Sequence, residues 1–507
     1  MSDFRCRDRR SLFLASVLAS LALSGCTVGP DFVKPAPQAP DDWTSWRSSD
    51  DSLHMSALAN SALPSDWWHA FNDPVLDWLE QHAFEASPDL LTAALRFAQA
   101  RTQRATTAAQ RGPDVTASGS VNRQRQSEYG AGTRLIDAVA GPTNREDLVQ
   151  VLSEPFTLYQ AGFDASWELD LWGRVRRSIE AADADVARQA ALLDLARLTL
   201  ASDVARNYFE LRTTQRQIRL TRKDITTLQD RLTLLEAQVL GGTANHLSLE
   251  QQRAELSALK AQLPDLLAQE GISINQLALL LGERPGALRQ ELSAPITDIP
   301  TALPDLTLGL PSEVALRRPD IRAAEARLHS ATASIGIAKA DLYPSIRLGA
   351  KFGYESYLSG EFSDWGSRTW SIGPSLNLPI FDNGRRKSVV QLRELQQQEA
   401  AVNYQQTVLK AWQEIDDALS GYTAEQQRLI ELQHRMHAAQ QAYELAQARY
   451  DGGVTDFTTV LDTQRGYLAA RRDLVMSQGQ LNNRFVLVNK TLGNIPTDPA
   501  SQGADRK

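Results

Sequence analysis

Two long stretches of the chain repeat apolar residues at helical spacing and contain few residues that would interrupt a helix. They run from Arg177 to Leu240 and from Lys387 to Tyr450, and their apolar positions are sparse and mostly Leu and Ala. This pattern is typical of helices that pack side by side rather than helices buried on all sides. Since roughly 60 residues of helix span about 90–100 Å, we expect two very long helices.

Each of these stretches meets a pair of glycines and then a second helical stretch. The pairs are Gly241-Gly242 and Gly452-Gly453, and the returning stretches run from Leu247 to Leu281 and from Phe457 to Leu492. Glycine enters the left-handed backbone conformation freely, so it is well suited to end a helix and reverse the chain. The sequence therefore predicts two helical hairpins with their tips at the two glycine pairs.

Four shorter stretches alternate apolar and polar residues with a period of two. In the second half of the chain they run from Ile346 to Tyr354 and from Trp370 to Leu378. In the first half a matching stretch runs from Tyr159 to Leu169, and a weaker one from Val115 to Val121. One apolar and one polar face predicts strands that lie between two different media.

A short apolar run near the N-terminus has the layout of a secretory signal. Four arginines between Arg5 and Arg10 precede the run, which ends in Leu-Ser-Gly-Cys at Cys26. We expect residues 1–25 to be a signal peptide. The last four residues resemble a bacterial lipobox, which implies cleavage before Cys26 and a covalent lipid such as palmitate on it; an ordinary cysteine is the alternative. Cys6 would leave with the signal, so the mature chain would have no intramolecular disulfide.

The strands form two predicted hairpins, at about residues 114–170 and 345–381. Their apolar face could meet membrane lipid, or it could pack on helices in a water-exposed sheet. The export signal and the aromatic residues at strand ends favour transmembrane strands. Four strands cannot close a barrel and open edges cannot sit in lipid, so several chains would have to share one barrel.

The elements occur twice in the same order, which defines the predicted organisation. Pro88 opens an Ala-rich helix that ends at Pro113, and Pro319 opens a similar helix that ends at Pro344. The fold class is therefore mostly α with a small β part. The predicted segments are a strap over 26–74, repeat 1 over 75–282, a linker over 283–318, repeat 2 over 319–493 and a tail over 494–507.

Composition excludes several kinds of function. The net charge of −8 over 507 residues argues against nucleic acid as a partner. The chain has no phosphate-binding loop and no recognisable nucleophile or acid–base motif, so we expect no enzyme. His434 and His437 share a helical face and permit a metal pair, but a solvated face is the better interpretation, so we expect no metal.

Separate motifs along the mature chain carry a family resemblance. They are Val28-Gly29-Pro30-Asp31-Phe32 after Cys26, Phe71-Asn72-Asp73-Pro74 after Trp68, Pro88-Asp89-Leu90, Trp167 to Gly173, and Asp462-Thr463-Gln464 after Gly453. Together they resemble the TolC-like outer-membrane efflux factor family, most closely its lipoprotein branch that works with proton-driven multidrug pumps. The resemblance implies a homotrimer with a 12-stranded outer-membrane β-barrel on a periplasmic α-barrel and a mixed equatorial belt.

The same resemblance implies the function and the partners. The chain would be the outer-membrane channel of a tripartite efflux system, a passive gated duct for drugs or other small toxic compounds. Its partners would be a periplasmic adaptor protein, an inner-membrane pump and outer-membrane lipid. The alternative function is a lipid-anchored periplasmic coiled-coil scaffold that binds partners without conducting.

The resemblance also suggests gate residues near the second tip. Asp462 matches an aspartate that lies near the periplasmic constriction in the family, and Tyr450 falls where some members hold the tip closed. Thr459 stands where some members carry a second aspartate, which argues against a double acidic ring. Asp456 could supply negative charge instead, or it could act only as a helix N-cap. Ser248 replaces an acid common in relatives, so the first tip should contribute less charge.

Overall fold

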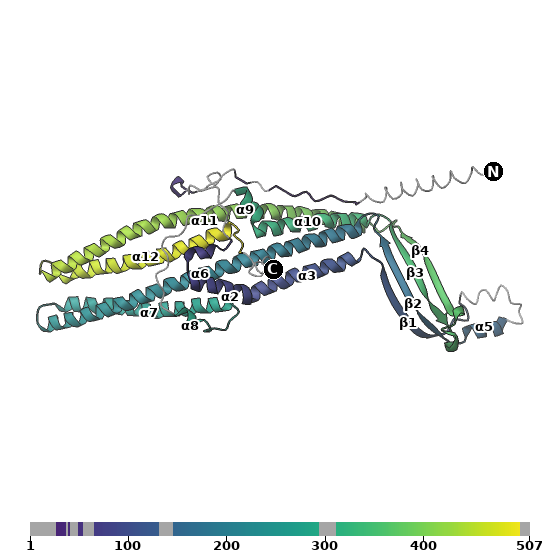
Figure 1. Cartoon of the computed structure of the whole chain (residues 1–507), viewed down its shortest axis with the longest axis horizontal. Coiled ribbons are helices and arrows are strands. Elements are labelled where there is room, and N and C mark those ends of the chain that lie inside the picture. Colours follow the sequence, from purple (N-terminus) through teal and green to yellow (C-terminus); the bar gives the residue numbers. More distant parts are fainter. Residues whose placement is uncertain are drawn as a thin grey trace, which may run out of the picture. The chain divides into compact units, whose positions relative to one another are not determined.

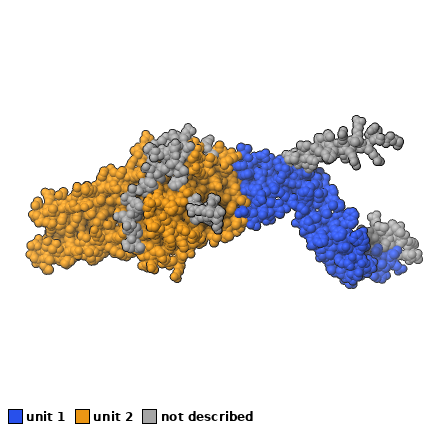
Figure 2. Space-filling view, viewed as in Figure 1, with its two compact units in different colours: residues 1–33, 100–185, 328–400 blue, residues 34–99, 186–327, 401–507 orange. Residues whose placement is uncertain are grey.

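The computed structural model of the chain describes residues 27–36, 39–40, 49–53, 65–130, 145–293 and 311–496. Long helices and one antiparallel sheet make up most of the chain (Figure 1). The chain forms two compact units: unit 1 comprises residues 1–33, 100–185 and 328–400, and unit 2 comprises the rest (Figure 2). Each unit draws on both predicted repeats. The predicted signal peptide and Cys26 lie outside the described residues.

Unit 1 contains the four strands. They are β1 (Asp114–Gln124), β2 (Phe156–Leu169), β3 (Ser345–Ser356) and β4 (Arg368–Asn377). Neighbouring strands are antiparallel and follow the order β1-β2-β3-β4. One hairpin from each predicted repeat therefore contributes to a single sheet. The connections contain the helix α5 (Arg145–Ser153) and the 3-10 turns η3 (Ser359–Glu361) and η4 (Trp365–Ser367).

The register places most apolar residues of the four strands on one face. One cross-strand row on that face consists of Ala117, Phe163, Phe352 and Trp370. Trp370 and Ile372, which lie on this face of β4, are 70% and 76% exposed. In the part of the chain that the structure describes, helices therefore do not cover this face, which argues against a sheet packed on a helical layer.

The opposite face of the sheet is polar. A row directly beside the apolar one contains Thr116, Asp164, Lys351 and Ser371. The Lys351 Nζ atom lies 3.2 Å from the Asp164 Oδ1 atom, so the row includes a cross-strand ion pair. Alternation of this kind gives the sheet one apolar and one polar surface.

The two long helical hairpins have equal lengths. Helices α6 (Arg174–Leu240) and α11 (Arg385–Asp451) contain 67 residues each, and α7 (His246–Leu280) and α12 (Phe457–Thr491) contain 35 each. A helix of 67 residues is about 100 Å long. A glycine with a positive φ precedes each of the two long helices, Gly173 before α6 and Gly384 before α11, and turns the chain into the helix.

The other α-helices on either side of the long hairpins are shorter. They are α2 (Pro74–Ala86), α3 (Pro88–Ala109), α8 (Arg289–Leu292), α9 (Pro311–Arg317) and α10 (Pro319–Ala340). Four of the five begin with proline, which has no amide hydrogen to leave unbonded in the first turn. Asp73 caps α2 by accepting bonds from the amides of Val75 and Leu76. None of the described helices is both long and apolar enough to cross a bilayer.

The main hydrophobic core of unit 2 joins the first and last parts of the chain. The 3-10 turn η2 (Trp67–Phe71) buries Trp67 and Phe71 against α6 and α12. The Phe71 ring lies 4.5 Å from that of Phe209 and 5.3 Å from that of Phe485. The end of the predicted strap is thus part of the core, and this core holds the middle of the long helices together. A further 3-10 turn, η1 (Asp51–Leu53), lies earlier in the strap.

Candidate functional site at the hairpin tips

The chain reverses at both glycine pairs, within unit 2 (Figure 1). Gly242 has a φ of 73°, and the Thr243 amide donates a 2.9 Å hydrogen bond to the Gln238 carbonyl. Gly453 has a φ of 69°, and the Val454 amide donates a 2.8 Å bond to the Arg449 carbonyl. A bond back over five residues with a left-handed glycine is a Schellman motif. Both tips therefore have the same sharp geometry.

The glycines before these two play a lesser part. The amides of Gly241 and Gly452 still bond to carbonyls of the preceding helix, those of Ala237 and Ala448. Neither residue has a positive φ. The reversal at each tip consequently depends on the second glycine of the pair.

Matching residues cap the returning helices. Asn245 accepts a 2.8 Å bond from the Ser248 amide at the start of α7. Asp456 accepts 3.1 Å bonds from both the amide and the hydroxyl of Thr459 at the start of α12. Of the two alternatives for Asp456, the structure therefore shows the N-cap. The side chain is also exposed, so its charge remains in contact with solvent.

Asp462 has a more open environment. Its side chain is 68% exposed, and its Oδ1 atom lies 3.8 Å from Arg465 Nη1. The Arg465 guanidinium is closer to Glu255 of α7, at 2.7 Å. Arg465 is shared between two carboxylates, so the negative charge of Asp462 is only partly compensated.

Tyr450 connects the two hairpins near their tips. Its hydroxyl donates a 3.4 Å bond to Gln238 Oε1 of α6, and its ring lies 5.3 Å from the ring of Phe457. These side chains border a small apolar cluster from all four helices. The buried members of the cluster are Leu235, Leu249, Ala446, Phe457, Val460 and Leu461. The tips are thus held together by apolar packing as well as by hydrogen bonds.

Arg231 makes a denser connection about three turns before the first tip. Its Nη2 atom donates to the Tyr443 hydroxyl at 2.6 Å and to Gln447 Oε1 at 2.8 Å. Its Nη1 atom donates to Gln464 Oε1 at 3.0 Å. Gln464 is buried, so the loss of this donor would leave a desolvated amide oxygen. One arginine of α6 therefore binds both helices of the second hairpin.

Further polar contacts run from α12 to the first hairpin. They join Arg465 to Glu255, Arg471 to Asp224, and Arg472 to Gln262. The sequence predicted none of these residues, nor Arg231. Gln464 belongs to the Asp-Thr-Gln motif, but the motif gave no role for it.

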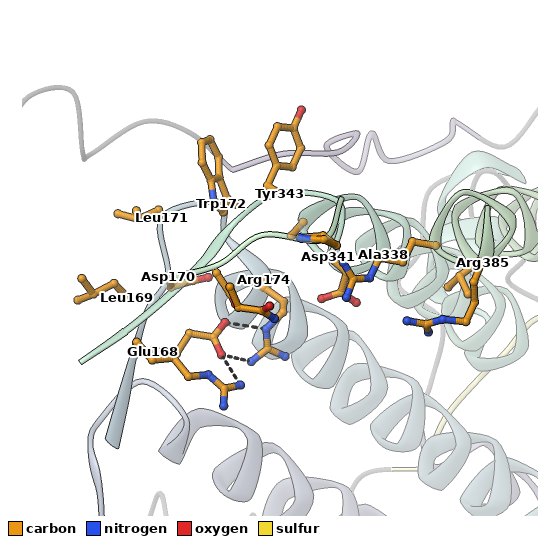
Figure 3. A pocket seen from close by; sticks show the side chains of 17 residues that line it. Glu168, Leu169, Asp170, Leu171, Trp172, Arg174, Ala338, Asp341, Tyr343 and Arg385 are labelled. Atoms are coloured by element: carbon orange, nitrogen blue, oxygen red, sulfur yellow. Dashed lines mark hydrogen bonds and ion pairs between the residues drawn. The ribbon is translucent and has the colours of Figure 1, made fainter. Parts of the chain in front are cut away.

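A second polar cluster lies in unit 1, where β2 and β3 meet the first turns of α6 and α11 (Figure 3). It lines a cavity of about 400 Å³. Glu168 accepts bonds of 2.8 and 2.9 Å from Arg174, and Arg347 lies 3.4 Å from the same carboxylate. This bidentate pairing fixes the guanidinium plane of Arg174 against the end of the strand.

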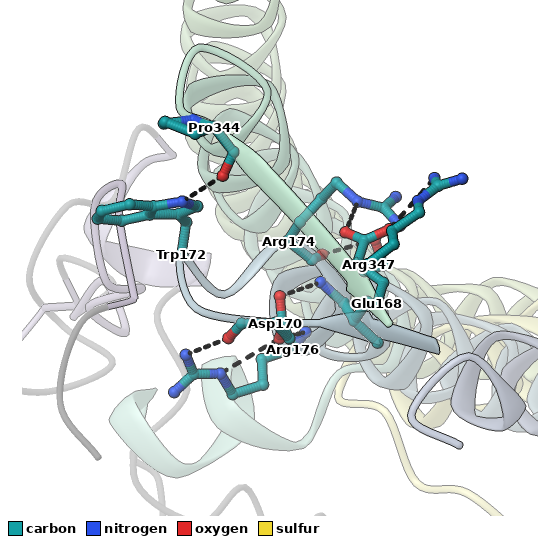
Figure 4. A network of polar contacts seen from close by, with 9 residues as sticks. Glu168, Asp170, Trp172, Arg174, Arg176, Pro344 and Arg347 are labelled. Atoms are coloured by element: carbon teal, nitrogen blue, oxygen red, sulfur yellow. Dashed lines mark hydrogen bonds and ion pairs between the residues drawn. The ribbon is translucent and has the colours of Figure 1, made fainter. Parts of the chain in front are cut away.

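The neighbouring turn is equally well bonded (Figure 4). Asp170 accepts 2.9 Å bonds from the amides of Val175 and Arg176, so it caps α6. The Trp172 indole donates to the Pro344 carbonyl at 2.7 Å and stacks on Tyr343. Arg174 and Arg176 of this turn thus form ion pairs with Glu168 and Asp170 of the same chain, which the sequence did not predict.

The possible histidine pair lies on an exposed face of α11. His434 and His437 are exposed on α11, and His437 Nε2 lies 3.0 Å from the Gln441 amide nitrogen. Within the described ranges, no group of three or more His, Cys, Asp or Glu side chains is arranged to hold a metal ion.

Comparison with known proteins agrees with the fold. The profile of the family described as outer membrane efflux protein matches residues 79–283 and 310–494. The solvent efflux pump outer membrane protein SrpC of Pseudomonas putida is 32% identical over 480 residues, which is 94% of this chain and 97% of SrpC.

Two solved channels have the same architecture. The outer-membrane channel OprN is 30% identical, with a TM-score of 0.81 over 92% of this chain and 99% of OprN. The open state of the Neisseria gonorrhoeae MtrE outer membrane channel is 27% identical, with a TM-score of 0.77 over 93% of this chain and 99% of MtrE. The similarity therefore includes the sheet and both helical hairpins.

Proposed function

Because the chain belongs to the outer membrane efflux protein family and is an efflux channel rather than an enzyme, we propose that it is a passive, gated duct. Drugs or other small toxic compounds would pass through it across the periplasm and the outer membrane. The observation that carries this proposal is the exposed apolar face of the sheet, on a chain that also forms helical hairpins about 100 Å long. A periplasmic scaffold that conducts nothing would not need such a face.

The duct would be a homotrimer with a shared 12-stranded barrel. Strands β1 and β4 are the two edges of the described sheet, and edge strands in lipid require a partner. Exposed leucines and valines on the helices of unit 2 support the same arrangement. Leu91 and Leu95 on α3, and Val402 and Leu409 on α11, are exposed in the single chain. Their spacing suits helix packing between subunits.

Energy and cargo selection would come from partners. SrpC is named as the outer membrane protein of a solvent efflux pump, which supports an inner-membrane pump and a periplasmic adaptor for this chain. The adaptor would meet the hairpin tips, since each tip is the far end of a 67-residue helix that starts shortly after a strand. A covalent lipid on Cys26 would anchor the chain to the outer membrane.

The tips would form the periplasmic gate. Tyr450 and Arg231 hold the second hairpin to the first, and Asp462 presents a partly compensated charge. Three copies of Asp462 around the bore would favour cations over anions, most strongly at low salt. The description of MtrE as an open state supports the existence of a closed one in this family.

Planar-bilayer conductance tests the duct. The purified full chain should give little current in its closed form. A Tyr450→Ala, Arg231→Ala double variant, which lacks two of the polar links between the hairpins near their tips, should give a steady current. Insertion into the bilayer is checked separately by flotation with liposomes. If the double variant floats with liposomes but carries no current, the duct is wrong and the scaffold is favoured.

A further inference from the structure

The residues that follow Cys26 lie against the rest of unit 1 through specific contacts. The motif Val28-Gly29-Pro30-Asp31-Phe32 was noted in the sequence, but the duct mechanism gives it no role. In the structure the Val28 amide donates a 3.1 Å hydrogen bond to the Trp172 carbonyl. This bond fixes the motif beside the turn that links β2 to α6.

Glycines on both sides of the contact permit the close approach. Gly29 has a φ of +100°, and a Cβ atom there would lie 2.5 Å from the Cα of Gly336 in α10. A Cβ atom at Gly173 would lie 2.6 Å from the Thr27 Cγ2 atom. Both distances are too short for real carbon contacts. Gly29 thus lets backbone approach backbone, and Gly173 makes room for the Thr27 side chain.

Charge and aromatic contacts complete the site. The Arg177 side chain is only 5% exposed, and its two Nη atoms lie 2.6 Å from Asp31 and 2.7 Å from Glu180. His329 stacks on Phe32 with ring centroids 4.2 Å apart, and its Nε2 atom lies 3.0 Å from Glu180. The Asp31 side chain is 86% exposed, so solvent screens its pairing with Arg177, and Glu180 remains as the second partner of the buried guanidinium.

We propose that Gly173, Arg177, His329 and Gly336 form a docking site for the segment Thr27–Phe32, and that this site fixes where the lipid-bearing N-terminus leaves the protein. The docking site follows from the contacts above, whereas its effect on the lipid rests on the acylation of Cys26 proposed earlier. Consecutive Cα atoms are about 3.8 Å apart, so the lipid would start one residue from Thr27. It would enter the membrane at the level of the stacked Trp172 and Tyr343 rings, where aromatic residues favour the interface.

Photo-cross-linking on the full-length protein tests the docking site. With p-benzoylphenylalanine in place of Phe32, irradiation should link this position to the His329 region of the same chain. Gly29→Ala should lower the yield about tenfold, which corresponds to ~1.4 kcal/mol of docking free energy. Asp31→Asn should lower it less, because Arg177 keeps Glu180. Gly286→Ala is the matched control, since Gly286 also has a positive φ but no neighbour within 4 Å of the added carbon.

Two results would overturn the docking site: an unchanged yield in Gly29→Ala, or cross-links mainly to another subunit. A Cys26→Ser variant, expressed behind a signal peptide that is cleaved without acylation, tests whether docking of the segment depends on the lipid. The cross-link should persist there, and its loss would mean that the lipid positions the segment. The mass of the N-terminal peptide reports acylation separately, so failure of the lipid anchor is distinguished from failure of the docking site.

Discussion

Asp456 and Asp462 are close in sequence, but their side chains have different environments. Asp456 is bonded to the first turn of α12, whereas Asp462 is exposed and lies near an arginine that it shares with Glu255. We expect Asp462→Asn to lower the cation-to-anion permeability ratio, and Asp456→Asn to change it much less. Reversal potentials in a KCl gradient at low ionic strength measure this ratio.

Asn keeps the cap that Asp456 provides, so Asp456→Asn separates charge from capping. Asp456→Ala serves as the complementary variant, and it should lower the unfolding free energy by about 1 kcal/mol. Equal shifts of the reversal potential in Asp456→Asn and Asp462→Asn would contradict the difference between the two residues.

Glu80 makes the stability of unit 2 depend on pH. Its side chain is fully buried in α2, and neither carboxylate oxygen has a hydrogen-bond partner among the described residues. Burial raises the pKa of Glu80 well above its ordinary value, and the nearby charge of Asp77 adds to the effect. The folded chain therefore holds this proton more tightly than the unfolded chain does.

Stability from this group is complete below the unfolded pKa of about 4.3 and falls as the pH rises toward the folded pKa. We expect the thermal unfolding midpoint to fall as the pH rises above the unfolded pKa, and Glu80→Gln to flatten this dependence. Differential scanning calorimetry measures the midpoint. Glu85→Gln, an exposed site on the same helix, is the control and should leave the slope unchanged.

At the scale of elements, one side chain of the first hairpin binds both helices of the second. Arg231 of α6 binds α11 and α12, whereas Arg253 of α7 pairs with Glu236 and Glu250 inside the first hairpin. We expect Arg231→Ala to raise the open probability in bilayers about tenfold or more, because hydrogen bonds to a charged donor contribute about 1.5–3 kcal/mol. Arg253→Ala removes an arginine with two carboxylate partners but no link between hairpins. A similar increase in that variant would show that the link is not the cause.

The sheet allows a comparison between its two faces. Ile372 lies on the apolar face of β4 and Thr369 on the polar face. A lysine on a lipid-facing position costs about 2–4 kcal/mol near the membrane centre, so Ile372→Lys should strongly reduce the amount of assembled protein in the outer membrane. Thr369→Lys adds the same charge toward water and should assemble normally. Quantitative immunoblots of outer-membrane fractions measure the amount of each variant that assembles. Equal assembly of the two lysine variants would contradict lipid contact on the apolar face.

At the scale of the whole molecule, the exposed side chains of α11 concern assembly. Val402 and Leu409 are one heptad apart and exposed in the single chain. A Val402→Glu, Leu409→Glu double variant should shift the detergent-solubilised protein from trimer to monomer in analytical ultracentrifugation. Gln269→Glu with Gln276→Glu adds the same charge to two exposed polar positions of α7, also one heptad apart, and should remain trimeric. A trimer in both variants would remove α11 from the interface.

Local sequence patterns predicted the helical hairpins and the strands, but they could not predict contacts between residues that are far apart in sequence. The glycine pairs and the alternating stretches gave the tips and the strands because both features act within a few residues. Whether Asp456 caps a helix depends on its side-chain rotamer, so the sequence left two alternatives. Arg231 and its acceptors are separated by 212 to 233 positions, and such pairs leave no periodic signal. The use of the arginines after Gly173 was missed for the same reason.

The equal lengths of the two hairpins limit how the length of the chain can change. One residue inserted into α6 would move everything beyond it by about 1.5 Å and turn it by about 100°, so buried positions would face outward. The same change in α11 alone would leave one tip beyond the other and separate Arg231 from Gln464. A longer version of this protein, suited to a wider periplasm, therefore requires matched insertions of whole heptads in all four helices. Lengthening one helix at a time would disrupt the packing between the hairpins.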